Sequence, residues 1–288
     1  MRFNLMHKIT KRLHPWPLIQ YDLRKNRRGF KKNAQGYGSS GNDIDCHKAD
    51  HVHVYLTLKC NFNCSFCINN LVAKRGEIFP YQDVKDWTLW VDALNRLKNL
   101  KELYFNGGEH LLLPYFPDVI NNLRGFNINI FSNLPRRGLD NLRRLQKNNN
   151  NIILRTSYHP LSDEPLNMFV DRYEQIPKDI LSSVIIIKDS GISTEMYIDG
   201  FSRYGIHATA ADLVCPGLDT SKTKNVMCNS MEHVIGPNMK VYRCAYNLVN
   251  NLDGIPFDEY EFKLKELPCN NYPKCFSCSS AYAKIKLR

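Results

Sequence analysis

The sequence of 288 residues lacks any run of about 18 or more apolar residues, the length that a helix needs to cross a membrane. We therefore expect no membrane-spanning segment. The first residues also lack the apolar stretch of a secretory signal, and we expect a cytoplasmic protein. Hydrophobic residues make up 43% and charged residues 23% of the chain. This composition is typical of a folded globular protein and excludes disorder for most of the chain.

Basic charge is concentrated near the start of the sequence. The formal net charge is +11, and residues 1–50 carry eleven basic side chains against four acidic ones. Such an arm can be a solvated extension that packs on the body, or it can bind nucleic acid, an anionic membrane surface or an acidic peptide leader. We expect three parts: a basic extension and linker at 1–50, a main domain at 51–212 and a cysteine-rich module at 213–288.

Short β-like runs alternate with helical stretches between residues 52 and 212. This alternation predicts βαβ units and a parallel sheet, and hence an α/β fold. About six units are present, fewer than the eight of a closed barrel, so we expect an open, partial (β/α)6 TIM-like barrel. The expected strands are 53–58, 102–105, 127–131, 152–156, 184–187 and 206–209, the expected helices are 81–97, 139–147, 165–175 and 194–203, and a short hairpin is expected from 233–235 and 241–242.

Most of the ten cysteines occur in two groups, and the first group follows the first expected strand. It contains Cys60, Cys64 and Cys67. In a reducing compartment, grouped cysteines more often bind metal than form disulfides. Structural zinc sites and ordinary electron-transfer clusters use four protein ligands. Three ligands therefore favour an iron–sulfur cluster with one iron open to a bound molecule; the alternative is a zinc knuckle or a set of buried thiols.

A second motif, Asn106-Gly107-Gly108-Glu109, follows the next expected strand. Two glycines let the backbone approach a ligand closely, and the glutamate can accept hydrogen bonds from an ammonium group. Taken alone, the motif is also consistent with an ordinary turn at a strand end. Its position one βα unit after the cysteine group favours a shared site, because the carboxyl ends of parallel strands meet at one edge of the sheet.

The C-x3-C-x2-C spacing after a first strand, with an aromatic residue before the last cysteine and the Gly-Gly-Glu turn one unit later, resembles the radical S-adenosylmethionine (SAM) superfamily. The resemblance implies that Cys60, Cys64 and Cys67 bind a [4Fe–4S] cluster whose free iron chelates SAM. It also implies reductive cleavage of SAM to a 5′-deoxyadenosyl radical that abstracts hydrogen from a substrate. An external one-electron reductant of the flavodoxin or ferredoxin type is then expected as a partner.

The same resemblance implies a set of SAM contacts. An aromatic ring is expected beside the adenine, and the Gly-Gly-Glu turn is expected to hold the SAM amino group, although the usual next proline is His110 here. Polar residues at later strand ends are expected near the ribose or, alternatively, as turn caps. Arg155 or Lys188 is expected to pair with the SAM carboxylate or to form a structural salt bridge. The expected SAM-binding residues are Phe66, Gly107, Gly108, Glu109, Ser132, Asn133, Arg155 and Ser157.

The second cysteine group lies in the last third of the chain and resembles the twitch module, the shortened relative of the SPASM module, which carries one auxiliary [4Fe–4S] cluster. The closest pattern uses Cys228, Cys244, Cys275 and Cys278, and Cys269 is a surplus cysteine that can replace one of these ligands. Zinc bound by the same thiolates is the alternative, because cysteine spacing does not separate the two metals.

Within this class, the first expectation is two-electron oxidation of a small alcohol or sugar-like substrate, helped by the auxiliary cluster. Modification of a peptide by a thioether or carbon–carbon crosslink is the second, and the basic extension then grips an acidic leader. Epimerisation is the third, with Cys215 as a candidate hydrogen donor or, alternatively, a small buried hydrophobe. A different class, a zinc-stabilised RNA-binding protein, leaves the three-cysteine group and the Gly-Gly-Glu turn unexplained, so a nucleic-acid partner is not expected.

Overall fold

The computed structural model describes residues 44–45, 51–64, 67, 69, 83–146, 150–162, 164–188, 193–212, 226–228, 233–262, 267–268 and 286–287. In this part of the chain, no helix combines the length and the apolar character that crossing a bilayer requires.

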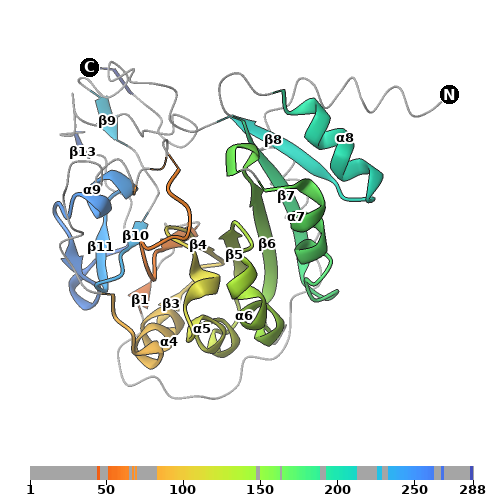
Figure 1. Cartoon of the computed structure of the whole chain (residues 1–288). Helices are drawn as coiled ribbons and strands as arrows, with labels where there is room; N and C mark the ends of the chain where they lie inside the picture. The colour runs from red at the N-terminus through yellow and green to blue at the C-terminus, as the bar shows by residue number, and fades with distance from the viewer. Residues whose placement is uncertain are drawn as a thin grey trace. The chain divides into compact units, whose positions relative to one another are not determined.

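Six parallel strands make up most of a nine-stranded sheet and stand side by side in chain order, which confirms the expected parallel α/β arrangement (Figure 1). The first strand is shorter than expected and ends at Val54, because the carbonyls of Thr57 and Lys59 pair with a turn and not with a strand. The strands are β2 (His51–Val54), β4 (Glu102–Phe105), β5 (Asn127–Ser132), β6 (Asn151–Tyr158), β7 (Leu181–Lys188) and β8 (Ala208–Asp212).

Five helices connect these strands and cover one face of the sheet (Figure 1). The first begins at Trp87, later than expected, because the side chain of Asp86 caps it by accepting from the backbone N–H of Thr88. The sequence predictions omit the second, α5, since its seven residues contain Pro117 and show no extended apolar repeat. The helices are α4 (Trp87–Asn95), α5 (Phe116–Asn122), α6 (Leu139–Arg144), α7 (Leu166–Tyr173) and α8 (Glu195–Arg203).

Alternation along the strands gives the sheet two different faces. One face is apolar and packs on the helices, with residues such as Val54, Phe105 and Ile130 fully buried in the main core. The opposite face, which we call the polar face, carries most of the polar strand side chains. In the six parallel strands it consists of His51, His53, Glu102, Tyr104, Asn127, Asn129, Phe131, Asn151, Ile153, Arg155, Ser157, Leu181, Ser183, Ile185, Ile187, Thr209 and Ala211.

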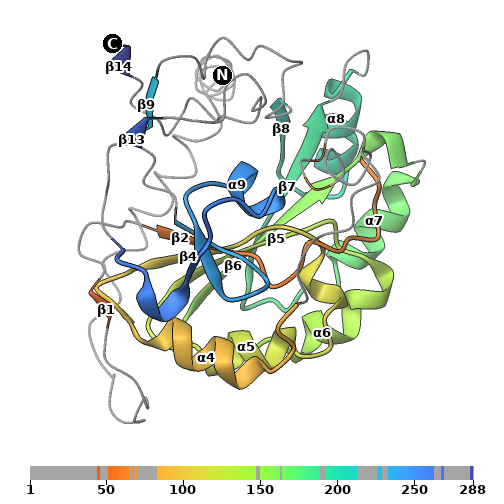
Figure 2. The same cartoon turned by 90° about the vertical axis from the view of Figure 1, so that its left-hand side faces the viewer.

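Three strands between residues 233 and 256 extend the same sheet beyond β2, on the side of the molecule that faces the viewer in Figure 2. The expected hairpin is confirmed as β10 (His233–Ile235) and β11 (Lys240–Tyr242), and β10 pairs in parallel with β2. The remaining strands are β12 (Ile255–Pro256) beside β11, β1 (Ile44–Asp45) paired with β3 (Leu97–Lys98), and β9 (Val226–Cys228) between β13 (Leu267–Pro268) and β14 (Lys286–Leu287). A short helix, α9 (Ala245–Val249), follows β11.

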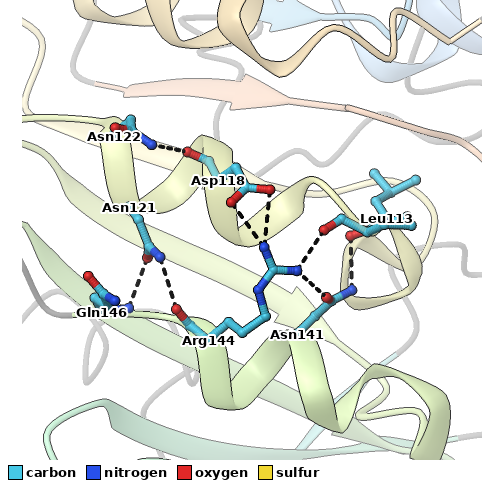
Figure 3. A network of polar contacts seen from close by, with 8 residues as sticks. Leu113, Asp118, Asn121, Asn122, Asn141, Arg144 and Gln146 are labelled. Carbon is cyan, nitrogen blue, oxygen red and sulfur yellow. Dashed lines mark hydrogen bonds and ion pairs between the residues drawn. The ribbon is translucent and has the colours of Figure 1, made fainter.

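Arg144 is the centre of a polar network that joins α5 to α6 (Figure 3). Its guanidinium donates to both carboxylate oxygens of Asp118, at 3.0 and 3.2 Å, and to the carbonyl of Pro114 at 3.0 Å. It also donates to Asn141 Oδ1, and Asn141 Nδ2 in turn donates to the carbonyls of Leu111 and Leu113 at 2.8 and 2.9 Å. The network thereby holds the chain segment that follows Glu109.

We expect the substitution Asn141→Ala to lower the free energy of unfolding by about 1–3 kcal/mol, because it removes a donor shared by two main-chain carbonyls. Urea unfolding measures the change. Asp140→Ala, on the same helix, is the matched control: Asp140 forms an exposed ion pair with Arg143, and its loss should cost less than about 1 kcal/mol. Equal effects of the two substitutions would show that Asn141 does not hold this segment.

Candidate active site

The cysteine loop follows the segment that leads out of β2. Cys60 is exposed, and Cys64 and Cys67 are half-buried. The backbone N–H of Phe62 donates to Cys60 Sγ at 3.4 Å, and that of Cys67 donates to the Cys64 carbonyl at 3.1 Å. Burial, followed by the charges of Cys67 and Cys60, raises the pKa of Cys64 to about 11. The Cys64 thiol therefore needs a nearby cation in order to ionise at neutral pH.

The Gly-Gly-Glu turn packs against the segment just before this loop. The backbone N–H of Gly108 donates to the Thr57 carbonyl, and that of Glu109 donates to the Lys59 carbonyl, both at 2.9 Å. A Cβ atom on Gly108 would lie 2.0 Å from the Lys59 carbonyl oxygen, and Gly107 has a φ of +120°. The two glycines therefore allow the end of β4 to approach the chain itself, just before Cys60.

Glu109 is buried at the base of this turn, with 2% of its surface exposed. Its Oε1 atom accepts from the backbone N–H of Leu111 at 3.1 Å and from the Ser132 hydroxyl at 2.8 Å, and Oε2 accepts from the backbone N–H of Asn133 at 2.8 Å. Burial raises the pKa of Glu109 to about 7, against the opposing effect of these hydrogen bonds. A cationic group beside it would favour the ionised carboxylate.

His110 occupies the position of the usual proline and is the first residue of a short 3-10 helix, η1 (His110–Leu112), a position where a proline is also tolerated. Its Nε2 atom accepts from the backbone N–H of Leu56 at 3.3 Å, and its ring stacks on Phe116 at a centroid distance of 5.5 Å. Burial lowers the pKa of His110 to about 3, so the ring is neutral. The turn is therefore formed without proline, and the imidazole instead ties it to the segment before the cysteines.

Asn133 joins the two motifs. Its backbone binds Glu109, while its Nδ2 atom donates to Asn61 Oδ1 at 3.0 Å and to Cys60 Sγ at 3.5 Å. Its Oδ1 atom is buried and has no hydrogen-bond partner within the described structure. The Ser132 hydroxyl is used inside the turn, where it donates to Glu109 and accepts from the backbone N–H of Leu134. The structure thus brings together Cys60, Glu109, Ser132 and Asn133.

Arg155 and Ser157 lie elsewhere, on the polar face of β6. Arg155 is buried, and its Nε and Nη2 atoms donate to Asn129 Oδ1 at 3.1 and 2.9 Å. Ser157 is half-buried and two residues nearer the carboxyl end of the strand. For Lys188 the structure describes the backbone but not the side chain.

The second cysteine group is described only in part. Cys215, Cys269, Cys275 and Cys278 lie outside the described residues, as does Phe66. Cys228 ends strand β9, where its backbone alone is described. Cys244 immediately precedes α9, is half-buried, and its Sγ atom lies 3.5 Å from Asn247 Oδ1. The auxiliary ligand set therefore stays a prediction.

Two residues without a role in the sequence predictions also make contacts here, Asn61 within the cysteine loop and His159 after β6. Asn61 bonds to Asn133, as described above, and His159 Nδ1 lies 3.8 Å from Cys64 Sγ, with its ring edge-on to Phe62. Burial lowers the pKa of His159 to about 4. His159 directly follows the end of β6, just as Asn133 follows β5, so the rule that functional residues follow strand ends could have identified it.

Residues 54–207 match the family model of the radical SAM superfamily. Similar solved structures include SuiB of Streptococcus suis bound to SAM, with 12% identity and a TM-score of 0.41, covering 80% of this chain and 67% of that one. SuiB alone and SuiB bound to its precursor peptide SuiA each show 10% identity and a TM-score of 0.42, covering 75% of this chain and 64% of theirs. The chain thus spans about two thirds of the length of these proteins. A search of curated proteins gave no match.

The family match covers more than half of the chain, so the protein belongs to the radical SAM superfamily and is an enzyme. Membership implies a [4Fe–4S] cluster and SAM. The donor set fits that cluster: three thiols share one loop, act on one another electrostatically, and include a sulfur that accepts hydrogen bonds from Phe62 and Asn133. In the described residues, no three His, Cys, Asp or Glu side chains are placed around a single metal-ion position.

The raised pKa of Glu109 predicts a specific pH dependence of stability. Between its ordinary value of 4.5 and about 7, the folded state holds a proton that the unfolded state has released, so the free energy of unfolding falls as the pH rises. Glu109→Gln has no such proton. Over this range, the iron-free wild-type protein should lose up to about 3 kcal/mol relative to the Gln variant, as measured by urea unfolding. A difference between the two proteins that does not change with pH would contradict the buried, protonated carboxyl.

Proposed function

We propose that this enzyme cleaves SAM reductively at a [4Fe–4S] cluster bound by Cys60, Cys64 and Cys67. When bound, the cluster and SAM supply a 5′-deoxyadenosyl radical that abstracts hydrogen from an unactivated carbon of the substrate. The observation that carries this proposal is the packing of the Gly-Gly-Glu turn, through two backbone hydrogen bonds, on the segment that leads into the cysteine loop. These bonds hold a buried carboxyl near Cys60, the first of the three clustered thiols, which suits a ligand with both a cationic group and metal-binding atoms.

In this proposal each residue around the turn and the cysteine loop has a distinct role. Glu109 accepts from the SAM amino group, and its carboxyl is held in place by Ser132 and the backbone of Asn133. The Asn133 side chain fixes Cys60 through its sulfur, and hydrogen bonds to cluster sulfurs also influence reduction potential. The partial (β/α)6 barrel at 51–212 provides the strand ends that carry these groups, with Phe66 beside the adenine and Ser157 near the ribose.

For the net reaction, we propose two-electron oxidation of a small alcohol or sugar-like substrate. A second [4Fe–4S] cluster in the module at 213–288, bound by Cys228, Cys244, Cys275 and Cys278 with Cys269 as a replacement, would accept the second electron. The half-buried position of the Cys244 thiol is consistent with a ligand role. An external one-electron reductant of the flavodoxin or ferredoxin type, in the cytoplasm, would supply the first electron.

Modification of a peptide is the second candidate. The observation that favours it is the excess of basic residues in the segment 1–50, which has the charge needed to hold an acidic leader sequence. In that case the same radical chemistry would form a crosslink in the peptide. Mass spectrometry separates the two candidates, since either a small molecule or a peptide would lose two hydrogens.

The ligand role of Cys64 can be tested by the substitution Cys64→Ala. We expect the anaerobically reconstituted variant to form no 5′-deoxyadenosine from SAM with dithionite, because two thiolates do not hold the cluster. Cys46→Ala, at a cysteine without an assigned role, is the control and should retain activity. Formation of 5′-deoxyadenosine by the Cys64 variant would refute the proposed ligand set.

Iron content tests the auxiliary cluster in the same preparations. The full chain should bind about eight iron atoms if it holds two four-iron clusters, and Cys64→Ala and Cys244→Ala should each bind about four. A wild-type content near four iron atoms, or zinc that is lost in Cys244→Ala, would contradict a second iron–sulfur cluster and leave the first unaffected.

A further inference from the structure

Three hydrogen-bonding side chains lie on neighbouring strands of the polar face. Arg155 on β6 is the register partner of Ser183 on β7, and Asn129 on β5 is two residues before Phe131, the register partner of Arg155 on the other side. Side chains alternate between the two faces along each strand, and the register places these three on the same face, opposite the helices. They form a row across three strands, at the middle of β5 and β6.

The contact between Arg155 and Asn129 determines which atoms of this row are available as donors. The guanidinium of Arg155 gives two hydrogen bonds to Asn129 Oδ1, which fixes the orientation of the amide and leaves Nδ2 as its donor. Asn129 is 0% exposed and Arg155 is 6% exposed. Within the described structure, the Asn129 Nδ2 atom and the Ser183 hydroxyl are buried and have no hydrogen-bond partner. Buried donors without partners are costly, so they indicate a group that binds there.

The charge on this face suits an anion. Among the described strand residues of the polar face, the single acidic side chain is Glu102, at the amino end of β4, where it accepts from the Tyr104 hydroxyl at 2.8 Å. The Phe131 ring lies 6.0 Å from the Arg155 guanidinium and shields one side of it. One planar guanidinium with an adjacent amide donor matches a carboxylate, which carries one charge and accepts in one plane.

The row lies nearer the amino ends of β5 and β6 than the residues that contact the cysteine loop. Asn129 precedes Asn133, which contacts Cys60, by four residues, and Arg155 precedes His159, which contacts Cys64, by four residues. At about 3.3 Å per residue, the Cα atoms of Asn129 and Arg155 lie about 13 Å along their strands from those of Asn133 and His159. The amino and carboxylate groups of SAM chelate the cluster iron in this superfamily and so must lie close to the cysteines. A carboxylate at Arg155 therefore belongs to a different molecule.

We propose that Arg155, Asn129 and Ser183 bind a carboxylate of the substrate, so that this enzyme acts on a carboxylate-bearing molecule, either a small acid or an acidic peptide. The inference rests on the proposed radical SAM function and gives it a substrate class. It also reassigns Arg155, which the sequence analysis pairs with the SAM carboxylate.

Binding of a simple carboxylate to the reconstituted full chain tests this proposal. The probe is trifluoroacetate, observed by ¹⁹F NMR with SAM present, and trifluoroacetamide is its uncharged counterpart. We expect trifluoroacetate to bind and the amide not to bind at the same concentration. Arg155→Gln and Asn129→Asp should each weaken trifluoroacetate binding by about tenfold or more, since one removes the charge and the other replaces a donor with a second carboxylate.

Two further variants serve as controls. Arg155→Lys keeps the charge and should restore part of the binding, which a purely structural role of Arg155 would not predict. Asn95→Asp makes the same change as Asn129→Asp at the last residue of α4, which is half-buried on the helix side of the sheet, and should bind trifluoroacetate like the wild-type protein. Equal binding of trifluoroacetate by the wild-type protein and by Asn129→Asp, or equal binding of the two probes, would overturn the proposal.

SAM binding, measured by equilibrium dialysis, distinguishes the two sources of a carboxylate. We expect Arg155→Gln and Asn129→Asp to change the SAM dissociation constant by less than about threefold. If SAM displaces trifluoroacetate and both variants weaken SAM binding as much as probe binding, the site belongs to SAM and the substrate assignment fails. If the wild-type protein binds trifluoroacetate through Arg155 but forms no 5′-deoxyadenosine, the proposed function fails and the carboxylate site stands.

Discussion

Two backbone hydrogen bonds, from Gly108 to Thr57 and from Glu109 to Lys59, set the geometry on which the candidate site depends. They place the end of the second parallel strand against the segment before Cys60, at a distance that a side chain at position 108 would not allow. Asn133, from the third strand, then binds both Glu109 and Cys60. Three strand ends thereby come to one point, and the glycines of this motif serve the packing of the chain as much as access for a ligand.

The two faces of the sheet have different roles: one packs on the helices and stabilises the fold, and the other carries the residues proposed to bind the substrate. The apolar face and the helices form the main core, and the Arg144 network ties α5 and α6 together on that side. The polar face carries most of the polar strand side chains and includes a buried guanidinium, which is an expensive feature for a fold to retain without use. Its donors lie deeper along the strands than the cysteine contacts, as expected if SAM occupies the strand ends and a second molecule lies beyond it.

The sequence predicted the parallel strands and the meeting of Cys60 with Glu109, because alternation and strand-end position are local signals. It did not predict the early end of β2 at Val54 or the bond from Leu56 to His110, because both depend on contacts between distant segments. The pairing of Arg155 with Asn129 requires the register of two strands, which periodicity does not supply. Tail residues such as Cys275 lie outside the described part of the chain, so their roles stay predictions.

The central claim is that the three-cysteine site leaves one iron open to SAM. Electron–nuclear double resonance on the reduced full chain, with SAM labelled with ¹⁷O in its carboxylate, tests it most directly. We expect a ¹⁷O coupling to the cluster that is retained in Arg155→Gln and lost in Cys64→Ala. A reduced cluster whose spectrum shows no ¹⁷O coupling when labelled SAM is bound would contradict it.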